Sequence, residues 1–124
     1  MNYSDLLHRK DSEGLTKFLK THDVNEEFHS QSLLYWAVHS NNFEFIKQLV
    51  HQGADLNLCD RLGRTPLLIA CYFGFIDIAS YLLENGAKSD GCLERAKQGW
   101  DDHIQTEIIE LLKQWEKKCK ILQS

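Results

Sequence analysis

The chain has 124 residues, of which 43% are hydrophobic and 26% charged, a composition that fits one soluble globular domain and argues against disorder. Its formal charge of −4 is spread along the sequence without a basic cluster, which argues against a nucleic-acid partner. No apolar run approaches the roughly 18 residues that cross a membrane, and the residues after Met1 lack the features of a signal peptide. We therefore predict a cytoplasmic protein with no membrane partner.

Residues 2–25 form the first predicted unit, which is shorter than those that follow. Its apolar positions are Leu6, Leu7, Leu15, Phe18 and Leu19. The unit closes at residues 23–25, and its many polar side chains fit an end of the protein that faces solvent.

The second unit covers residues 26–58. Ser32 stands where a hydroxyl caps a helix, and Asn41 stands at a tight reversal where Asn tolerates a positive φ. The apolar stripe of its second helix is Phe45, Ile46, Leu49 and Val50. Residues 53–57, which include Gly53, close the unit.

The third unit, residues 59–91, has the clearest pattern. Gly63 is placed in a turn that needs positive φ, and Thr65 precedes Pro66 at the first position of a helix. We predict one helix from Pro66 to about Phe73 and a second from Ile76 to about Glu84, with Gly74 between them and Gly86 after the second.

Much of this unit recurs 33 residues earlier. The equivalent pairs are Leu67 and Leu34, Ala70 and Ala37, Leu82 and Leu49, Gly86 and Gly53, and Ala87 and Ala54. With this period, the segment Thr65-Pro66-Leu67-Leu68-Ile69-Ala70 resembles the Thr-Pro-Leu-His-x-Ala core of the ankyrin repeat. The resemblance implies an all-α solenoid of helix-turn-helix units with short β-turn fingers. It implies a single domain over residues 1–124 with about four repeats, approximately 2–25, 26–58, 59–91 and 92–124, the first and last being degenerate caps.

The pattern weakens after Gly91. Leu93 and Ala96 still match the first helix of a repeat, and residues 107–112 match the second helix if about four extra residues lie around Trp100 to His103. The final helix carries a stripe at spacings of three and four, formed by Ile104, Ile108, Leu112, Trp115, Cys119 and Leu122. We expect it to cover the open end of the stack, and a dimerising coiled coil is the alternative.

Candidate chemistry is sparse. The six histidines and four cysteines contain no Cys-x-x-Cys, His-Glu-x-x-His or Gly-x-Ser-x-Gly motif, so we predict no enzyme activity, no metal site and no cofactor. The cysteines show no short pairing, and by the resemblance Cys59 and Cys92 occupy equivalent places in stacked repeats, about 10 Å apart, too far for a disulfide. Free thiols are predicted, with Cys71 buried and inert.

The resemblance also indicates where a partner would bind. In ankyrin stacks the turn tips and the ends of the inner helices line a concave groove. The corresponding residues are Phe28, His29, Gln31, His39, Ser40, Arg61, Leu62, Arg64, Tyr72 and Phe73. Aromatic and arginine anchors dominate many interfaces. A second interpretation is open for these aromatics, in which Phe73 and Phe75 turn inward to fill the groove, or Tyr72 packs on the irregular repeat that follows.

We therefore predict a small, stand-alone protein-interaction module, monomeric when free, that binds a specific protein such as a toxin or an enzyme through its concave face. Binding would mask or inhibit that partner by occlusion. One alternative is an immunity protein that neutralises a cognate bacterial toxin. Another is a structural or assembly adaptor that uses the C-terminal helix.

Overall fold

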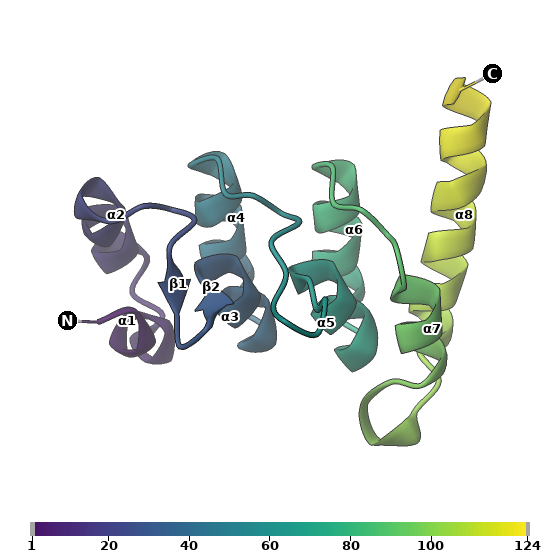
Figure 1. The fold of residues 1–124 in the computed structure, drawn as a ribbon, viewed down its shortest axis with the longest axis horizontal. Helices are drawn as coiled ribbons and strands as arrows, with labels where there is room; N and C mark the ends of the chain where they lie inside the picture. The colour runs from purple at the N-terminus through teal and green to yellow at the C-terminus, as the bar shows by residue number, and fades with distance from the viewer. Residues whose placement is uncertain (1, 124) are drawn as a thin grey trace. The chain divides into compact units, whose positions relative to one another are not determined.

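The computed structural model describes the backbone of residues 2–123 and the side chains of residues 2–118. Over this part of the chain there are eight α-helices, one 3₁₀ turn and one two-stranded hairpin (Figure 1). The predicted all-α helical-repeat fold is confirmed. None of these helices is both long enough and apolar enough to span a membrane. The chain divides into two compact units, Met1–Pro66 and Leu67–Ser124. These are called the first unit and the second unit from here on, and they are larger than the repeat units predicted from the sequence.

The first unit contains two helical pairs and the hairpin between them. Its elements are α1 (Tyr3–Arg9), α2 (Ser12–Thr21), β1 (Glu27–Phe28), β2 (Gln31–Ser32), α3 (Leu33–His39) and α4 (Phe43–His51). Helix α1 packs on α2, α3 packs on α4, and α2 packs on α4. The buried Tyr3 ring lies 5.9 Å from Phe18 and 6.2 Å from Phe45, and its hydroxyl donates a 2.6 Å hydrogen bond to the carbonyl oxygen of Leu33. Burial of each large apolar side chain here contributes about 1.5–3 kcal/mol.

The local signals for the second pair of helices behave as predicted. The Ser32 hydroxyl accepts a 3.0 Å hydrogen bond from the Tyr35 amide and caps α3. Asn41 has a φ of 55° at the reversal, and the side chain of the next residue, Asn42, caps α4 by accepting from the Phe45 amide.

The hairpin is closed by a two-residue turn. Phe28 pairs with Gln31, and His29 and Ser30 between them have φ values of 49° and 67°. Two consecutive left-handed residues are the geometry that gives a hairpin its tightest turn, although Asn and Gly adopt it more readily than His and Ser. The turn places the His29 and Ser30 side chains at an exposed tip.

The second unit holds the third helical pair and the irregular C-terminal one. Its elements are α5 (Pro66–Phe73), α6 (Ile76–Glu84), α7 (Cys92–Lys97), the 3₁₀ turn η1 (Trp100–Asp102) and α8 (Thr106–Gln123). The bounds of α5 and α6 match the prediction, and Gly74 between them has a φ of 78°. Cys71 of α5 and Cys92 of α7 are buried in this unit, and both are free thiols, as is Cys59 of the first unit.

The extra residues predicted around Trp100 form η1 and the loop that leads to α8. Helix α8 contacts α6 and α7, and its Ile108 and Leu112 side chains are buried inside the unit. These two members of the predicted stripe are therefore used within the chain and are not free to contact a second copy. Ile104 departs from the prediction, because it precedes α8 and is 58% exposed. The side chains of Cys119 and Leu122 lie outside the described residues.

Candidate protein-interaction site

A five-residue turn in the first unit, residues 60–64, is held by the carboxylate of Asp60. Oδ1 accepts hydrogen bonds from the amides of Leu62 (2.9 Å) and Arg64 (3.0 Å). Oδ2 accepts from the Arg64 guanidinium at 2.6 and 2.7 Å and from Gln31 Nε2 at 2.7 Å. Gly63 adopts positive φ within the turn, as predicted. This turn is called the clamped finger below.

The electrostatics of the clamped finger favour a charged pair. The Asp60 side chain is 7% exposed, and burial alone would raise its pKa, but the hydrogen bonds it accepts outweigh burial and hold the pKa below its usual range. The same contact raises the pKa of Arg64. The pair is thus ionised at neutral pH, and it ties the finger to Gln31 at the end of the hairpin.

The clamped finger and the hairpin border one hollow of about 700 Å³. Its lining residues are Glu27, Ser30, Gln31, Cys59, Asp60, Arg61, Leu62 and Arg64. Four predicted site residues therefore meet here: Gln31, Arg61, Leu62 and Arg64. Leu62 is 73% exposed at the tip of the finger, more than Trp100 at 59% or Ile104 at 58%.

The other four predicted residues of the first unit meet in a second hollow of about 520 Å³. It is lined by Ser4, Leu7, His8, Phe28, His29, Trp36, His39 and Ser40, and is called the histidine hollow below. The indole of Trp36 donates a 2.6 Å hydrogen bond to the Phe28 carbonyl oxygen and lies edge-on to His39, with ring centroids 5.8 Å apart. The Phe28 and His29 rings also meet edge-on, at 4.2 Å.

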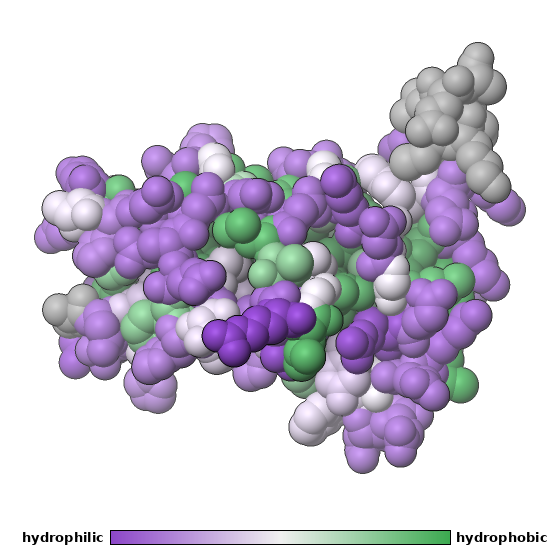
Figure 2. Space-filling model, in the orientation of Figure 1, coloured by the Kyte–Doolittle hydropathy of each residue, from purple (hydrophilic) through white to green (hydrophobic). Residues whose placement is uncertain are grey.

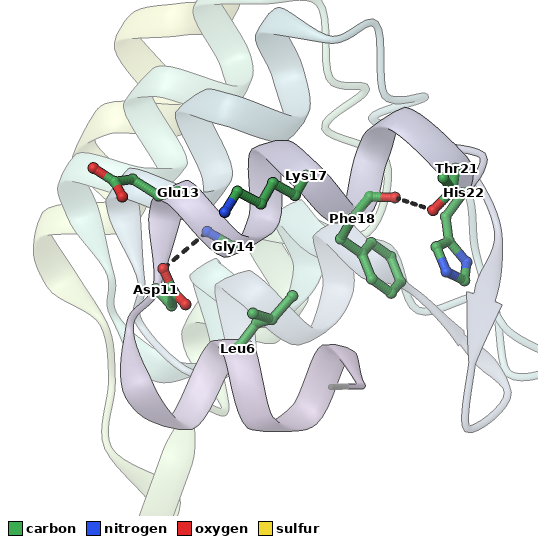
Figure 3. A pocket seen from close by; sticks show the side chains of 8 residues that line it. All are labelled: Leu6, Asp11, Glu13, Gly14, Lys17, Phe18, Thr21 and His22. Carbon is green, nitrogen blue, oxygen red and sulfur yellow. Dashed lines mark hydrogen bonds between the residues drawn. The ribbon is translucent and has the colours of Figure 1, made fainter.

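A third hollow of about 440 Å³ lies between α1 and α2 and contains none of the predicted residues (Figure 3). It is lined by Leu6, Asp11, Glu13, Gly14, Lys17, Phe18, Thr21 and His22. Asp11 caps α2 through a 2.8 Å hydrogen bond from the Gly14 amide, and a Cβ on Gly14 would collide with Leu6. These contacts serve the packing of the two helices.

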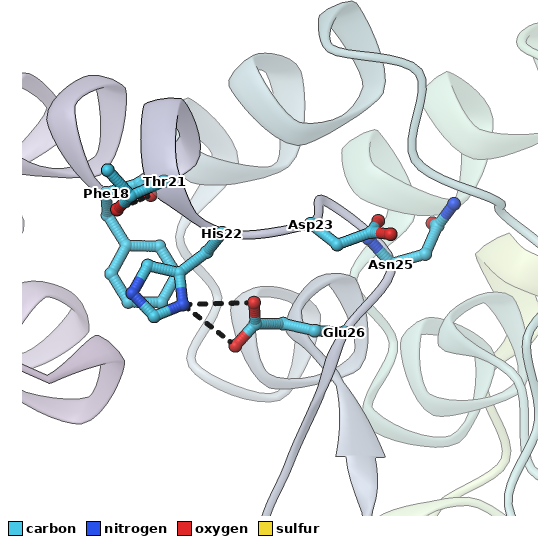
Figure 4. A network of polar contacts seen from close by, with 6 residues as sticks. All are labelled: Phe18, Thr21, His22, Asp23, Asn25 and Glu26. Atoms are coloured by element: carbon cyan, nitrogen blue, oxygen red, sulfur yellow. Dashed lines mark hydrogen bonds and ion pairs between the residues drawn. The ribbon is translucent and has the colours of Figure 1, made fainter.

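The segment after α2 is tied down by polar contacts (Figure 4). The ring of His22 stacks on Phe18 with centroids 3.8 Å apart, and its Nδ1 lies 3.0 Å from Glu26. Asn25 accepts a 2.7 Å hydrogen bond from the Asp55 amide, which joins the closing segments of two successive helical pairs. The contacts hold the approach to the hairpin in place.

The last two predicted residues, Tyr72 and Phe73, lie in the second unit at the end of α5. Both are half-buried, which falls between the exposed and core interpretations left open by the sequence. Their rings meet edge-on at 5.1 Å, and both contact Trp100, which is 59% exposed. On the face shown in Figure 2, hydrophobic areas are small and separated by hydrophilic side chains.

Sequence reasoning missed three contributors to these sites. Trp36 is half-buried and lines the histidine hollow, and its spacing of three from His39 on one helix is a signal that the sequence offers. Asp60 was not singled out, although an Asp that opens a turn with Gly three residues later is a recognisable pattern. His8 shares no such local signal. Among the residues that the structure describes, no group of three or more His, Cys, Asp or Glu side chains could hold a metal ion.

Comparison with known proteins decides the family. The model for ankyrin repeats, in three copies, matches residues 7–91. The chain belongs to the ankyrin repeat family. It is 37% identical to protein phosphatase 1 regulatory subunit 27 of Homo sapiens over 116 residues, which is 90% of this chain and 75% of that protein. It is 40% identical to the protein of the same name in Mus musculus over 91 residues, 71% of this chain and 59% of that protein.

A further relative is Notch-regulated ankyrin repeat-containing protein A of Danio rerio, 39% identical over 61 residues, 49% of this chain and 54% of that protein. The ankyrin repeats and the regulatory-subunit relatives together point to protein partners and to a non-catalytic role. In this ankyrin chain the clamped finger and the hairpin are the β-turn elements that project from the helical pairs.

Proposed function

We propose that this ankyrin repeat chain binds one partner protein through its finger and hairpin residues and masks part of that partner's surface. The observation that carries the proposal is the exposed Leu62 on a finger held rigid by Asp60. The apolar surface of Leu62 is solvated in the free chain, so a partner that covers it gains the free energy of burial, and a side chain on a rigid turn loses little conformational entropy on binding.

The chemistry around Leu62 fits the plan of a specific interface, in which polar groups surround an apolar centre. Arg61 is exposed beside it and forms no ion pair with any residue that the structure describes, while Asp60 balances the charge of Arg64. The histidine hollow adds the half-buried rings of Phe28 and Trp36. We expect the partner to place apolar side chains on Leu62 and an acceptor group near Arg61.

We further propose that the partner is the catalytic subunit of protein phosphatase 1. The support is the name of the human and mouse relatives, of which the human one is covered over 75% of its length. An immunity role would use the same surface against a bacterial toxin, and the relatives' name favours the phosphatase. The free chain is expected to be a monomer, which light scattering measures directly.

Binding of the phosphatase catalytic subunit to the immobilised chain tests both statements. The informative variant is Arg61→Ala with Leu62→Ala, because both side chains are exposed and we expect their removal to leave the fold intact. The matched control is Glu44→Ala with Lys47→Ala, two exposed residues on α4. We expect the first variant to bind about tenfold or more weakly, equivalent to about 1.4 kcal/mol, and the control to bind as wild type does.

Phosphatase activity then distinguishes masking from positioning. If the chain masks a surface that recognises protein substrates, hydrolysis of a phosphoprotein slows while hydrolysis of a small aryl phosphate does not. Slowing of both reactions would instead mean that the active site is covered. Failure of the wild-type chain to bind the phosphatase at tens of micromolar would contradict the choice of partner, and equal binding by the finger variant would contradict the choice of surface.

A further inference from the structure

Four aromatic rings of the second unit form a continuous surface at the end of α5. Phe73 lies 5.1 Å from Tyr72, 5.6 Å from Phe75 and 5.4 Å from Trp100, measured between ring centroids. Tyr72, Phe73 and Phe75 are half-buried, whereas Trp100 is 59% exposed and Ile104, on the same loop, is 58% exposed. These four rings are called the aromatic cluster below. Tyr72 and Phe73 contact the Trp100 ring, and more than half of the Trp100 surface stays open to a ligand.

The loop that carries Trp100 is fixed at several points. The Gly99 amide donates to the His103 carbonyl oxygen at 3.1 Å, and the His103 amide donates to the Trp100 carbonyl oxygen at 3.1 Å. Gln105 joins the loop to two helices, because its amide donates to Ala96 of α7 and its side chain donates to the Tyr72 carbonyl oxygen of α5, at 2.8 and 3.1 Å. Trp100 is therefore presented by an ordered loop.

The electrostatics of this surface favour a cation. Asp101 and Asp102 directly follow Trp100, both are exposed, and neither forms an ion pair with any residue in the described part of the chain. The C-terminal end of α5, at Tyr72 and Phe73, adds the partial negative charge of the last carbonyl groups of a helix. The π face of Trp100, the two unpaired carboxylates and the C-terminal end of α5 all contribute negative electrostatic potential, which attracts a cation.

We propose that the aromatic cluster, with Asp101 and Asp102, binds an arginine-containing segment of a partner protein. The guanidinium plane would stack on the exposed face of Trp100, since tryptophan is the strongest cation–π partner, while the carboxylates balance the charge. An apolar residue next to that arginine would pack on Ile104. Arginine fits better than lysine because its weakly hydrated planar group loses less solvation when it stacks.

The same charges argue against other occupants. The exposed carboxylates of Asp101 and Asp102, the two residues that follow Trp100 in the chain, would repel an acidic peptide and the phosphates of a nucleic acid. A second copy of this chain has a formal charge of −4 and would bring further negative charge to the surface. The inference does not depend on the phosphatase, because it concerns residues of the second unit and is tested with synthetic peptides.

The test is a titration of the ¹⁵N-labelled full chain with capped seven-residue peptides, in which two arginines alternate with leucines. The reporter is the indole N–H signal of Trp100, assigned by its loss in Trp100→Phe. Peptides with glutamine or glutamate in place of arginine provide the comparison. We expect the arginine peptide to move the Trp100 signal, with binding that weakens as salt is raised, and the other two to bind at least fivefold more weakly.

The decisive variant is Asp101→Asn with Asp102→Asn. Both residues have a φ of 57°, and asparagine tolerates this conformation well, so the loop keeps its shape while losing two charges. The matched control is Glu84→Gln with Asp90→Asn, which removes two exposed charges elsewhere in the same unit. We expect about tenfold weaker binding for the first variant and a change within twofold for the control.

Several outcomes would overturn the proposal. Equal binding of arginine and glutamine peptides would mean that the surface recognises apolar groups alone, and tighter binding of the glutamate peptide would reverse the assigned charge. A Trp100 signal that no peptide moves at millimolar concentration would leave the surface without this ligand. A Trp100 signal that shifts with protein concentration in the absence of peptide would identify a second copy as the occupant.

Discussion

Replacing Asp60 by alanine is the sharpest test of how the clamped finger is held. The substitution removes the acceptor of five contacts, those from the Leu62 and Arg64 amides, from two guanidinium nitrogens of Arg64 and from Gln31. Hydrogen bonds to a charged group contribute about 1.5–3 kcal/mol each, but contributions within one network do not add. Arg64 is 37% exposed and can recover water. We therefore expect a loss of about 2–3 kcal/mol in the free energy of unfolding, below the 3–5 kcal/mol typical of a fully buried pair.

The conservative variant and a control sharpen this prediction. Asp60→Asn keeps an oxygen for the two amides and loses the ion pair, so we expect a smaller cost of about 1–2 kcal/mol. Asp55→Ala removes an exposed aspartate that accepts one local hydrogen bond, from the Asn57 amide, and should cost about 0.5 kcal/mol. Urea unfolding followed by circular dichroism measures all three. A cost for Asp60→Ala no larger than that for Asp55→Ala would refute the clamp.

The pH dependence follows from the lowered pKa of Asp60. A carboxylate whose pKa is lower in the folded chain than in the unfolded chain stabilises the fold fully above its ordinary value of about 4. That stability is lost as the pH falls toward the lower, folded-state pKa. The difference in unfolding free energy between wild type and Asp60→Asn should thus be constant from pH 7 to about pH 5 and should shrink below about pH 4.

Two further predictions concern backbone and thiols. Gly74→Ala should cost about 1–2 kcal/mol, because its φ is 78° and a Cβ would displace the Gln105 side chain from its hydrogen bond to the Tyr72 carbonyl oxygen. Gly63→Ala, with positive φ but open space around it, should cost about 1 kcal/mol or less. Thermal unfolding compares the two variants, and a larger cost at Gly63 would contradict the packing argument. The side-chain contact with Cys92 and burial both raise the pKa of the Cys71 thiol. Alkylation mapped by mass spectrometry should therefore label exposed Cys59 in the native protein and reach the buried Cys71 and Cys92 only after unfolding. Labelling of Cys71 as early as Cys59 would show that Cys71 is accessible.

The sequence by itself determined the helical repeats, because their signals are local or strictly periodic. A residue that must adopt positive φ, such as Asn41 or Gly74, marks a reversal wherever it stands, and Ser32 caps the helix that begins one residue later. The 33-residue period then requires successive units to resemble one another. Helix bounds from Pro66 to Glu84 could be stated in advance for these reasons.

The grouping of the site residues needed the tertiary structure. Gln31 and Asp60 are 29 positions apart, and no local pattern indicates that they share a hydrogen bond. The predicted residues of the first unit separate into two hollows, and neither Trp36 nor His8 was assigned to one of them. Such contacts depend on which side of a helix faces a neighbour, and a rotation of 100° per residue moves a side chain from core to surface.

The aromatic cluster illustrates the division most clearly. The sequence showed that Tyr72 and Phe73 end a helix and that an insertion lies near Trp100, because both follow from departures from the repeat. Whether the insertion folds away from α5 or against it is decided by hydrogen bonds such as that of Gln105 to the Tyr72 carbonyl oxygen, 33 positions apart. The inserted residues around Trp100 have no counterparts in the other 33-residue repeats. Their position is therefore set only by the groups that they contact in the folded chain.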